Sequence, residues 1–348
     1  MTFEDLVNYA KKEGASDIHI TMGTHHAIRK FGELIILDPL PPGNEARDMI
    51  VDSLTIEQRE KLLKGDDLDF ALIMPDGTRL RANVYHQRNN IAGSYRLLRD
   101  KIPTFEELGI PEVVRKLVNE PRGLVLFTGP TGSGKTTTLA AMIDYINSNS
   151  AKHVITVEDP IEYVFYHKKS MIHQREIGKD VEDFATALHS SLREDPDIIL
   201  VGEMRDYETI SAAMTAAETG HLVLSTVHTS SAAQTVERIL DAYPPHAQNQ
   251  ARTQLANNLK ATITQVLMPD IDGNGMIMGT EILINNEAIS TMIRENKTHQ
   301  IPSSIASGAA VGMHTLNMDL KRLMREQKID EQTARLYSTN LREFDSLR

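Results

Sequence analysis

The chain has 348 residues, of which 41% are hydrophobic and 24% are charged, with no cysteine and a formal net charge of −11 at pH 7. This length favours two domains, and the absence of a bilayer-spanning apolar run and of a signal-peptide pattern leads us to expect a cytoplasmic protein without a transmembrane segment. The lack of cysteine excludes disulfides, thiol nucleophiles and cysteine-ligated metal sites, and the negative charge argues against a broad surface for nucleic acid.

The first hundred residues, 1–100, are predicted to form a small α+β domain. Thr2 and Asp5 have the spacing of a capping box at the start of a helix. Alternation of apolar and polar residues indicates strands after this helix. The expected elements are a helix over 2–12, strands over 18–22 and 31–37, helices near 45–53 and 55–64, and strands over 68–74, 79–87 and 91–98.

A linker is predicted over 101–118, where Pro103, Gly109 and Pro111 interrupt regular structure. The domain that follows, over 119–348, alternates strands with helices, and its strands are continuous apolar runs of the kind found in parallel sheets covered on both faces. This pattern predicts a doubly wound α/β core. The expected elements are strands over 124–128, 153–157, 197–201 and 221–226, helices over 135–148, 181–194, 206–218 and 231–240, and a helix-rich remainder from 245 with a hairpin near 270–275.

A phosphate-binding loop lies between the first strand and the first helix of this core. Its pattern, G-x-x-x-x-G-K-[ST], arises by accident in a chain this long with a probability on the order of one in a hundred. Backbone N–H groups of such a loop surround a β-phosphate, Lys135 reaches the β- and γ-phosphates, and the Thr136 hydroxyl coordinates Mg²⁺. The alternative is a glycine-rich turn in an ordinary βα unit. The predicted nucleotide-binding residues of the loop are Gly129, Pro130, Thr131, Gly132, Ser133, Gly134, Lys135, Thr136 and Thr137.

Three carboxylates, Glu158, Asp159 and Glu162, follow the strand that ends at 157. Sites of α/β sheets form at the carboxyl ends of strands, so we expect these acids beside the phosphates. Carboxylates there would help to hold Mg²⁺, with Glu158 and Asp159 as ligands together with Thr136. The alternative is a solvated loop with ordinary acidic residues.

Glu203 follows the apolar strand 197–201 and resembles the acid of a Walker B segment. Many nucleotide hydrolases carry an aspartate for Mg²⁺ beside this glutamate, but here that neighbour is Gly202. We therefore expect Glu203 to polarise the attacking water, and metal coordination to depend on the acids after residue 157. The alternative is an acid that stabilises the start of a helix through its dipole.

Two histidines and two arginines complete the predicted site. His221 and His228 lie at the two ends of a buried strand, and His228 is at the carboxyl end, where a γ-phosphate would sit. A lone histidine is more often an ordinary core or surface residue, but its place at the strand end favours a phosphate-sensing role for His228, while the two readings are balanced for His221. Arg81 and Arg96 of the first domain are candidates for an arginine supplied to the hydrolytic site, although arginines on strands often form a solvated face.

Taken together, the segments 129–137, 157–162, 192–197, 201–206 and 220–229 resemble the motifs of the type II/type IV secretion ATPase superfamily: Walker A, Asp box, atypical Walker B and His box. Within it the whole chain is most similar to the type IV pilus retraction ATPases, the PilT family. Extension ATPases usually carry a longer N-terminal region and a four-cysteine metal module, which this sequence lacks.

The resemblance implies a RecA-like P-loop core, a PAS-like N-terminal domain and ATP bound between them with Mg²⁺. It also implies that Arg81 and Arg96 reach the nucleotide. As partners it implies a homohexameric ring and an inner-membrane platform protein, so that the protein works peripherally at the cytoplasmic face of the membrane and needs no nucleic acid.

One position departs from the family. Its C-terminal Ala-Ile-Arg-Asn-Leu-Ile-Arg-Glu motif, which is linked to retraction, reads here with Ser290 in place of the first arginine. Serine lacks the charge and the bidentate donor of arginine, so ATP hydrolysis is expected to survive while its coupling to retraction is in question. The alternatives are a secretion or pilus-extension ATPase, a retraction accessory subunit, and a nucleotide-dependent regulatory switch. A nucleic-acid translocase is disfavoured by the acidic balance.

Overall fold

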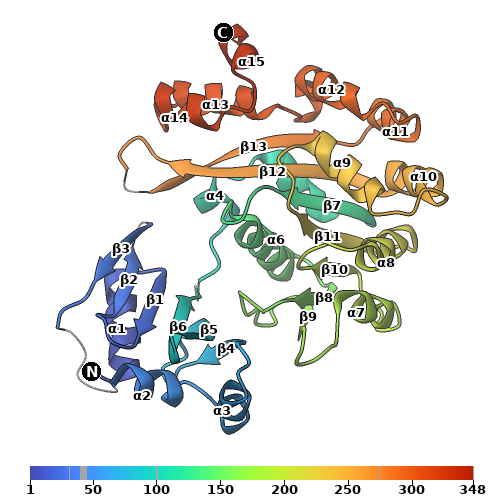
Figure 1. Ribbon diagram of the computed structural model, residues 1–348. Coiled ribbons are helices and arrows are strands. Elements are labelled where there is room, and N and C mark those ends of the chain that lie inside the picture. The colour runs from blue at the N-terminus through green and yellow to red at the C-terminus, as the bar shows by residue number, and fades with distance from the viewer. Residues whose placement is uncertain (31, 40–44, 99–100, 274, 348) are drawn as a thin grey trace. The chain divides into compact units, whose positions relative to one another are not determined.

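The computed structural model describes residues 1–30, 32–39, 45–98, 101–273 and 275–347. The chain divides into two compact units, Met1–Lys101 and Ile102–Arg348 (Figure 1). The predicted boundary at residue 100 lies outside the described residues. Each unit has its own sheet and its own hydrophobic core, and each is described by itself.

The smaller unit is built on an antiparallel sheet with the strand order β3-β2-β1-β6-β5-β4. Leu6, Ile18, Ile50, Leu80 and Tyr95 lie in the core between one face of this sheet and the helices. The elements are α1 (Phe3–Glu13), β1 (Asp17–Thr21), β2 (Ala27–Lys30), β3 (Glu33–Ile36), α2 (Glu45–Asp52), α3 (Ile56–Leu63), β4 (Leu68–Ile73), β5 (Arg79–Gln87) and β6 (Asn90–Leu97).

Most elements predicted for this unit are confirmed, including the capping box of Thr2 and Asp5 at the start of α1. The strand expected over 31–37 is present as β3. Strand β2 was not predicted; it pairs with β3 in a hairpin that turns at Gly32, with a φ of +85°. Phe31, the first residue of the predicted strand, lies outside the described residues.

The larger unit contains a seven-stranded sheet with the order β13-β12-β7-β11-β10-β8-β9. Its strand pairs are parallel except for the β12–β13 hairpin. The strands are β7 (Gly123–Thr128), β8 (His153–Glu158), β9 (Met171–Glu176), β10 (Ile198–Val201), β11 (Leu222–Val227), β12 (Leu259–Pro269) and β13 (Met276–Ile284).

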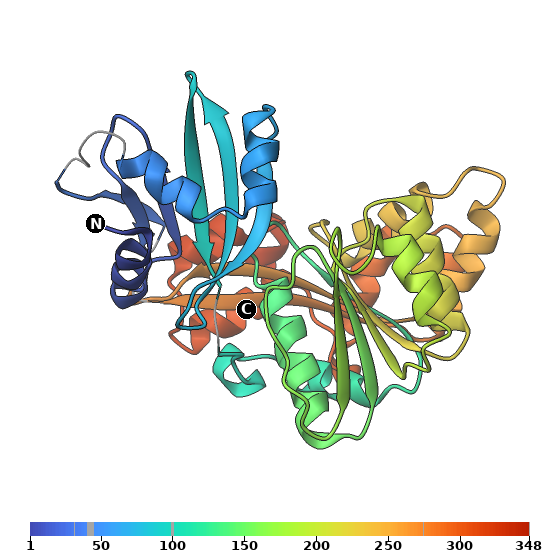
Figure 2. The same ribbon diagram turned by 90° about the horizontal axis from the view of Figure 1, so that it is seen from below.

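Helices cover both faces of this sheet (Figures 1 and 2). Side chains of β7 alternate between the two resulting cores, with Leu124 and Leu126 in one and Val125 and Phe127 in the other. The helical elements are α4 (Phe105–Leu108), α5 (Glu112–Lys116), η1 (Leu117–Asn119), α6 (Lys135–Asn149), α7 (Phe184–Ser191), α8 (Tyr207–Glu218), α9 (Ala232–Asp241), α10 (Gln248–Asn258), α11 (Glu287–Arg294), η2 (Thr298–Gln300), α12 (Ile301–Ser307), η3 (Ala309–Val311), α13 (Leu316–Arg325), α14 (Glu331–Tyr337) and α15 (Leu341–Ser346).

The segment 101–118, expected as a linker, carries α4, α5 and the start of η1, and Phe105, Val114 and Leu117 pack in a core of the larger unit. Three further features of this unit differ from the sequence prediction. Strand β9 was not predicted, because its polar residues follow no apolar alternation. Helix α7 is shorter than the predicted 181–194, since the Asp183 side chain accepts a hydrogen bond from the Thr186 N–H and caps it at Phe184. The hairpin expected near 270–275 exists, but its long strands extend the core sheet, because β12 pairs with β7.

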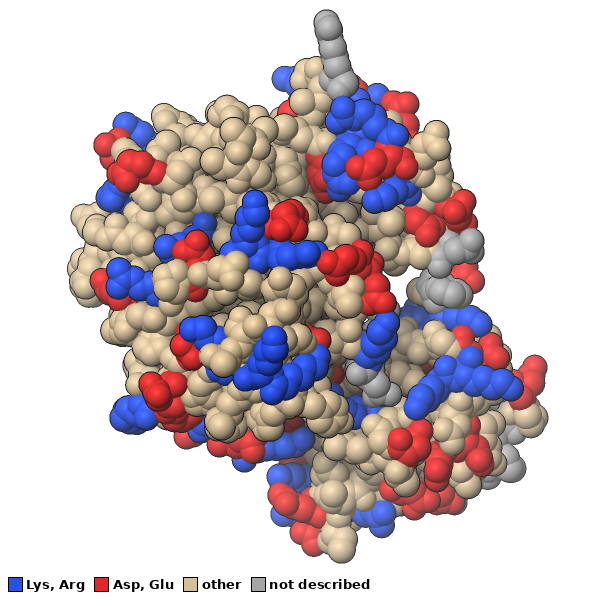
Figure 3. All heavy atoms as spheres, turned by 180° about the vertical axis from the view of Figure 1, so that it is seen from behind, with Lys and Arg blue, Asp and Glu red and all other residues tan. Residues whose placement is uncertain are grey.

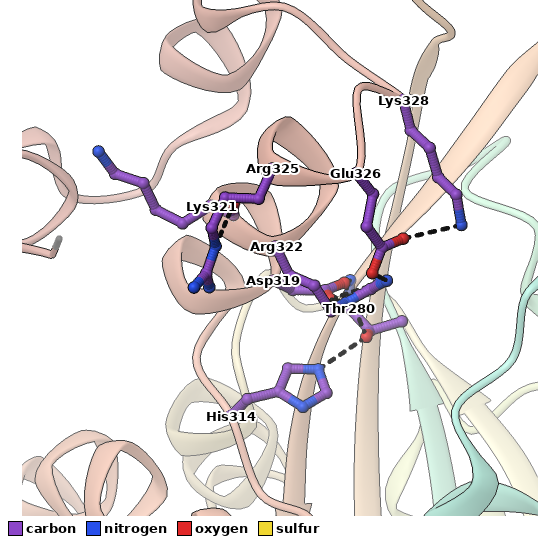
Figure 4. Close-up of polar contacts among 8 residues, drawn as sticks. All are labelled: Thr280, His314, Asp319, Lys321, Arg322, Arg325, Glu326 and Lys328. Carbon is purple, nitrogen blue, oxygen red and sulfur yellow. Dashed lines mark hydrogen bonds and ion pairs between the residues drawn. The ribbon is translucent and has the colours of Figure 1, made fainter.

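The last helices pack on the β12–β13 hairpin through a buried polar network (Figure 4). The Asp319 carboxylate accepts hydrogen bonds from the Thr280 N–H at 2.8 Å and hydroxyl at 3.2 Å, and it pairs with Arg322 at 2.7 Å. His314 Nε2 lies 2.9 Å from the same Thr280 hydroxyl. Since a buried carboxylate is stable only when it is paired and hydrogen-bonded, this network fixes α13 against β13.

Candidate active site

The parallel part of the larger sheet brings four predicted site segments to one edge. Strands β7 and β11 pair from Gly123↔Leu222 to Thr128↔Val227, and β10 runs in the same direction beside β11 and β8. The carboxyl ends of these four strands therefore lie together. The phosphate loop, the acids after β8, Glu203 and His228 all follow those ends.

The phosphate loop needs its glycines for two separate reasons. Gly132 and Gly134 have φ values of +81° and +87°, which side-chain-bearing residues rarely adopt. At Gly129, with a φ of +138°, a Cβ would lie 2.3 Å from the carbonyl oxygen of Gln265. The loop is thus held directly against β12, a contact that the sequence analysis missed because Gln265 lies about 130 residues farther along the chain.

Lys135 lies inside the loop at the start of α6. Its Nζ donates hydrogen bonds to the carbonyl oxygens of Gly129 and Pro130, both at 2.8 Å. Burial lowers the pKa of Lys135, and the nearby carboxylates of Glu203 and Glu162 oppose that shift. The structure therefore places the lysine and two of the predicted acids close enough to interact.

The first turn of α6 is connected to the acidic segment. Thr136 is half-buried at the second position of the helix. The Thr137 hydroxyl lies 3.2 Å from the Tyr163 hydroxyl, which is in the segment after β8. Neither Tyr163 nor this contact was predicted, and an aromatic residue next to Glu162 was the only signal for it in the sequence.

Glu203 and His228 lie side by side at the ends of β10 and β11. Glu203 Oε2 is 3.5 Å from His228 Nε2, and Glu203 Oε1 is 2.8 Å from Nε of Arg205. A Cβ on Gly202 would lie 3.3 Å from the Val157 carbonyl oxygen. A side chain at residue 202 would therefore be a tight fit against the backbone of β8, at the position where a Walker B aspartate would stand.

The acids at the carboxyl end of β8 have different surroundings; Glu158 is the last residue of the strand, and Asp159 and Glu162 follow it. Glu158 is buried, and its Oε1 accepts hydrogen bonds from the Thr156 hydroxyl at 2.6 Å and from Gln174 Nε2 at 3.1 Å. Burial raises the pKa of Glu158 to about 7, although these two hydrogen bonds act in the opposite direction. Asp159 is exposed, and Glu162 is half-buried.

The donor chemistry of these residues fits Mg²⁺, which prefers oxygen ligands and commonly takes one or two carboxylates with substrate phosphates and water. Thr136 offers a hydroxyl, and Glu158 and Asp159 offer carboxylates. Among the described residues, no three histidine, aspartate or glutamate side chains form a ready metal site. A site completed by phosphate and water is consistent with that finding.

His221 does not join this group within the protomer. Its carbonyl oxygen accepts a hydrogen bond from the Gly123 N–H at the start of β7, and its Nδ1 lies 3.0 Å from the Ala216 carbonyl oxygen at the end of α8. The six residues of β11 separate His221 from the phosphate-loop edge by roughly 20 Å. The expectation that His221 contacts nucleotide therefore has no support from the fold of one protomer.

Arg81 and Arg96 are neighbours on the sheet of the smaller unit. They pair in register across β5 and β6, so both side chains project from the same face, opposite the core. Arg81 forms an ion pair with Asp69 at 3.0 Å, and Arg96 forms one with Asp17 at 2.9 Å. The side chains are 37% and 63% exposed, so both arginines are accessible to a ligand from outside this unit.

Two further expectations concern a surface for nucleic acid and a transmembrane segment. Lysine and arginine side chains alternate with acidic ones over the face shown in Figure 3, so the cationic groups that the figure draws there form no broad area of one sign. Across the described ranges, no helix combines the length and the apolar composition needed to cross a bilayer.

Comparisons with known proteins extend these findings. The model of the type II/IV secretion system protein family matches residues 2–346. The type IV pilus retraction ATPase PilT of Pseudomonas aeruginosa is 44% identical over 96% of this chain and 97% of its own length. A twitching motility protein of Neisseria gonorrhoeae is 44% identical over 90% of this chain and 84% of its own length.

A crystal structure of the pilus retraction motor PilT with bound ADP superimposes with a TM-score of 0.92 and 42% identity, covering 100% of both chains. The α/β fold class and the superfamily resemblance predicted from the motifs are confirmed. Nucleotide binding is supported by the same comparisons.

Proposed function

The chain belongs to the type II/IV secretion system protein family and is an ATPase of the pilus retraction type, and we propose that it works as a hexameric motor that retracts type IV pili. The observation that carries this proposal is the convergence of Lys135, Glu203 and His228 at one edge of the sheet. Since the chain matches pilus retraction proteins over nearly its whole length, we infer that this site hydrolyses ATP to drive retraction.

The phosphate loop, residues 129–136, would bind ATP through its backbone N–H groups and Lys135. In the present structure Lys135 donates to loop carbonyls, and phosphate oxygens would replace them as acceptors. Thr136, Glu158 and Asp159 would hold Mg²⁺. When bound, the ion would neutralise charge on the phosphates during hydrolysis.

Glu203 would take a proton from the attacking water, and His228, which lies 3.5 Å away, would contact the γ-phosphate. Arg81 and Arg96 would supply positive charge to the transition state. His221 and His228 lie at opposite ends of β11, and His228 is the one at the phosphate-loop edge. We therefore assign the contact with the γ-phosphate to His228 alone.

The motor would assemble as a homohexamer of about six times the chain mass and act on a platform protein at the cytoplasmic face of the inner membrane. The similarity to retraction ATPases over the full length supports this assembly. Light scattering of the purified protein with ATP tests it. A monomer with full activity would contradict the ring.

The central test of the enzyme is Glu203→Gln. This change keeps the shape of the side chain but removes the proton acceptor, so we expect the turnover number to fall about 10²- to 10⁴-fold while ATP still binds. A matched control is Glu331→Gln, which removes an exposed carboxylate paired with Arg335 on α14. Substantial hydrolysis by the Glu203 variant would overturn the assignment.

The retraction role is tested in a cell that lacks its own retraction ATPase. If this chain restores twitching and removes surplus pili, it is a retraction motor. In a second strain that lacks its extension ATPase, restoration of pilus assembly would instead indicate an extension ATPase. Rescue of twitching by the Glu203→Gln protein in the first strain would indicate a switch that needs no turnover.

An accessory role in retraction is the second candidate, and Ser290 favours it. Ser290 is buried on α11, and its hydroxyl donates to the Ala256 carbonyl oxygen at 2.9 Å or to Asn285 Oδ1 at 3.1 Å. It therefore ties α11 to the end of α10 instead of presenting a cation. An accessory subunit would need a second retraction ATPase in the same cell for twitching.

A further inference from the structure

Each carboxylate oxygen of Glu203 faces a nitrogen-bearing side chain in this protomer. Arg205 Nε lies 2.8 Å from Oε1, and His228 Nε2 lies 3.5 Å from Oε2. A general base must present an oxygen lone pair to the water that it deprotonates. The shorter of the two contacts, with Arg205, therefore opposes the role proposed for Glu203.

The backbone around Glu203 is held in place from β11. The Gly202 carbonyl oxygen accepts a hydrogen bond from the Thr226 hydroxyl at 2.7 Å, and the Met204 N–H donates to the Thr226 carbonyl oxygen at 3.0 Å. Glu203 is bracketed by these two bonds. Its side chain is 20% exposed, whereas that of Arg205 is 71% exposed, so the arginine is the partner with room to move.

Arg205 has a second acidic neighbour in sequence, but that carboxylate is already engaged. Asp206 caps α8 by accepting hydrogen bonds from the Thr209 N–H at 2.8 Å and hydroxyl at 3.0 Å. Glu203 is the carboxylate that pairs with Arg205 in the described structure. The cap also fixes the chain direction after residue 205 and keeps the guanidinium near Glu203.

We propose that Arg205 is a positioning residue that restrains Glu203 in the protomer and releases it when another anion draws the guanidinium away. The inference rests on the proposed function, because it assigns Glu203 the proton-accepting role. Its consequence is a low basal rate of hydrolysis that rises when the pair opens.

The expected size of the effect follows from the exposure of the pair. An ion pair with a largely exposed arginine contributes little, so its removal should raise turnover two- to fivefold and no more. Arg205→Ala should therefore increase the turnover number of the basal ATPase and leave KM for ATP unchanged. Arg205→Lys keeps a cation near Oε1 and should stay close to the parent rate.

The control is Arg335→Ala, which removes an arginine that also forms a 2.8 Å ion pair but lies on α14. It should leave turnover unchanged. A fall in turnover for Arg205→Ala, an equal rise for Arg205→Lys, or an equal rise for the control would each overturn the inference. If Arg205→Ala does not fold, as judged by its melting temperature, Arg205→Gln replaces it with the same expected outcome.

The double variant Glu203→Gln/Arg205→Ala separates this inference from the proposed function. It should be as inactive as Glu203→Gln alone. If Glu203→Gln retains turnover, the assignment of the base fails and the role of Arg205 fails with it. If Glu203→Gln is inactive and Arg205→Ala shows no increase, only the restraint by Arg205 is wrong.

Discussion

The phosphate-loop edge of the larger sheet and the arginine row of the smaller sheet present their side chains in different ways. At the phosphate-loop edge, residues from four separate segments meet because parallel strands end on the same side. In the smaller unit, Arg81 and Arg96 are aligned by antiparallel pairing and project from one face, each beside an acid of its own sheet.

The larger unit brings its candidate site residues into contact with one another. The smaller unit holds Arg81 and Arg96 on an exposed face without such a site. Lys135, Glu203 and His228 interact within the larger unit. The arginines have local partners and need a ligand from elsewhere to become catalytic. The four predictions below test this contrast, beginning with the largest effect.

Replacing Arg81 or Arg96 with alanine should lower the turnover number of the assembled motor about 10³-fold, because arginines supplied to hydrolytic sites act on transition-state charge. Binding of a fluorescent ADP analogue should be retained. Arg29→Ala is the control, since Arg29 pairs with Asp17 across β1 and β2 and shares the row with Arg96. An equal loss in the Arg29 variant would show that general charge, not these two arginines, matters.

Glu158→Gln tests the buried carboxylate of the larger unit. The folded pKa of about 7 lies above the ordinary 4.5, so ionisation between these values lowers the stability of the parent as pH rises. The variant has no such ionisation. Its free energy of unfolding relative to the parent should rise by up to about 3 kcal/mol from pH 4 to pH 8, measured by urea denaturation. A difference that does not change with pH would contradict the raised pKa.

Gly129→Ala tests the contact between the phosphate loop and β12. The new Cβ would overlap the Gln265 carbonyl oxygen, so the loop must shift and nucleotide affinity should fall about 10²-fold, as measured by calorimetry. Gly77→Ala in the smaller unit is the control, because Gly77 has a φ of +87° but no atom within 4 Å of the added Cβ. It should cost about 1 kcal/mol of stability and leave affinity unchanged.

Asp17→Asn should have the smallest effect. It removes the charge that holds Arg96 at 2.9 Å, but the arginine is 63% exposed and such pairs contribute at most about 1 kcal/mol. KM for ATP and the melting temperature should change little, with less than a threefold effect on KM. A larger loss of activity would mean that Asp17 positions Arg96 for catalysis, and the two regions would then differ less than proposed.

Much of this molecule could be predicted from the sequence because its signals are local. The strand, glycine-rich loop and helix around 124–148 follow from adjacent residues, since positive φ and helix initiation are properties of single positions. The same holds for Glu203 and His228, each of which directly follows an apolar strand. The motifs of the secretion ATPase superfamily consist of the same short segments. The resemblance to that superfamily therefore indicates the phosphate loop, Glu203 and His228 as well.

The predictions that failed concern partners distant in sequence. Strand β9 is polar, and it becomes a strand by pairing with β8 at the edge of the sheet. The region after residue 245 was predicted as rich in helices, so the pairing of β12 with β7 was missed. This pairing brings Gln265 to the phosphate loop. The role predicted for His221 stays a prediction; within the protomer the length of β11 separates this residue from the phosphate-loop edge.

The fold class, the phosphate loop and the acid after β10 follow from the sequence, because backbone conformation and strand ends are encoded by neighbouring residues. The burial of Glu158 with its raised pKa, the exposure of Asp159, and the contacts of Arg205 and His228 with Glu203 arise from the tertiary structure. Burial and pairing depend on segments brought together by the sheet, and no local pattern records which segments those are.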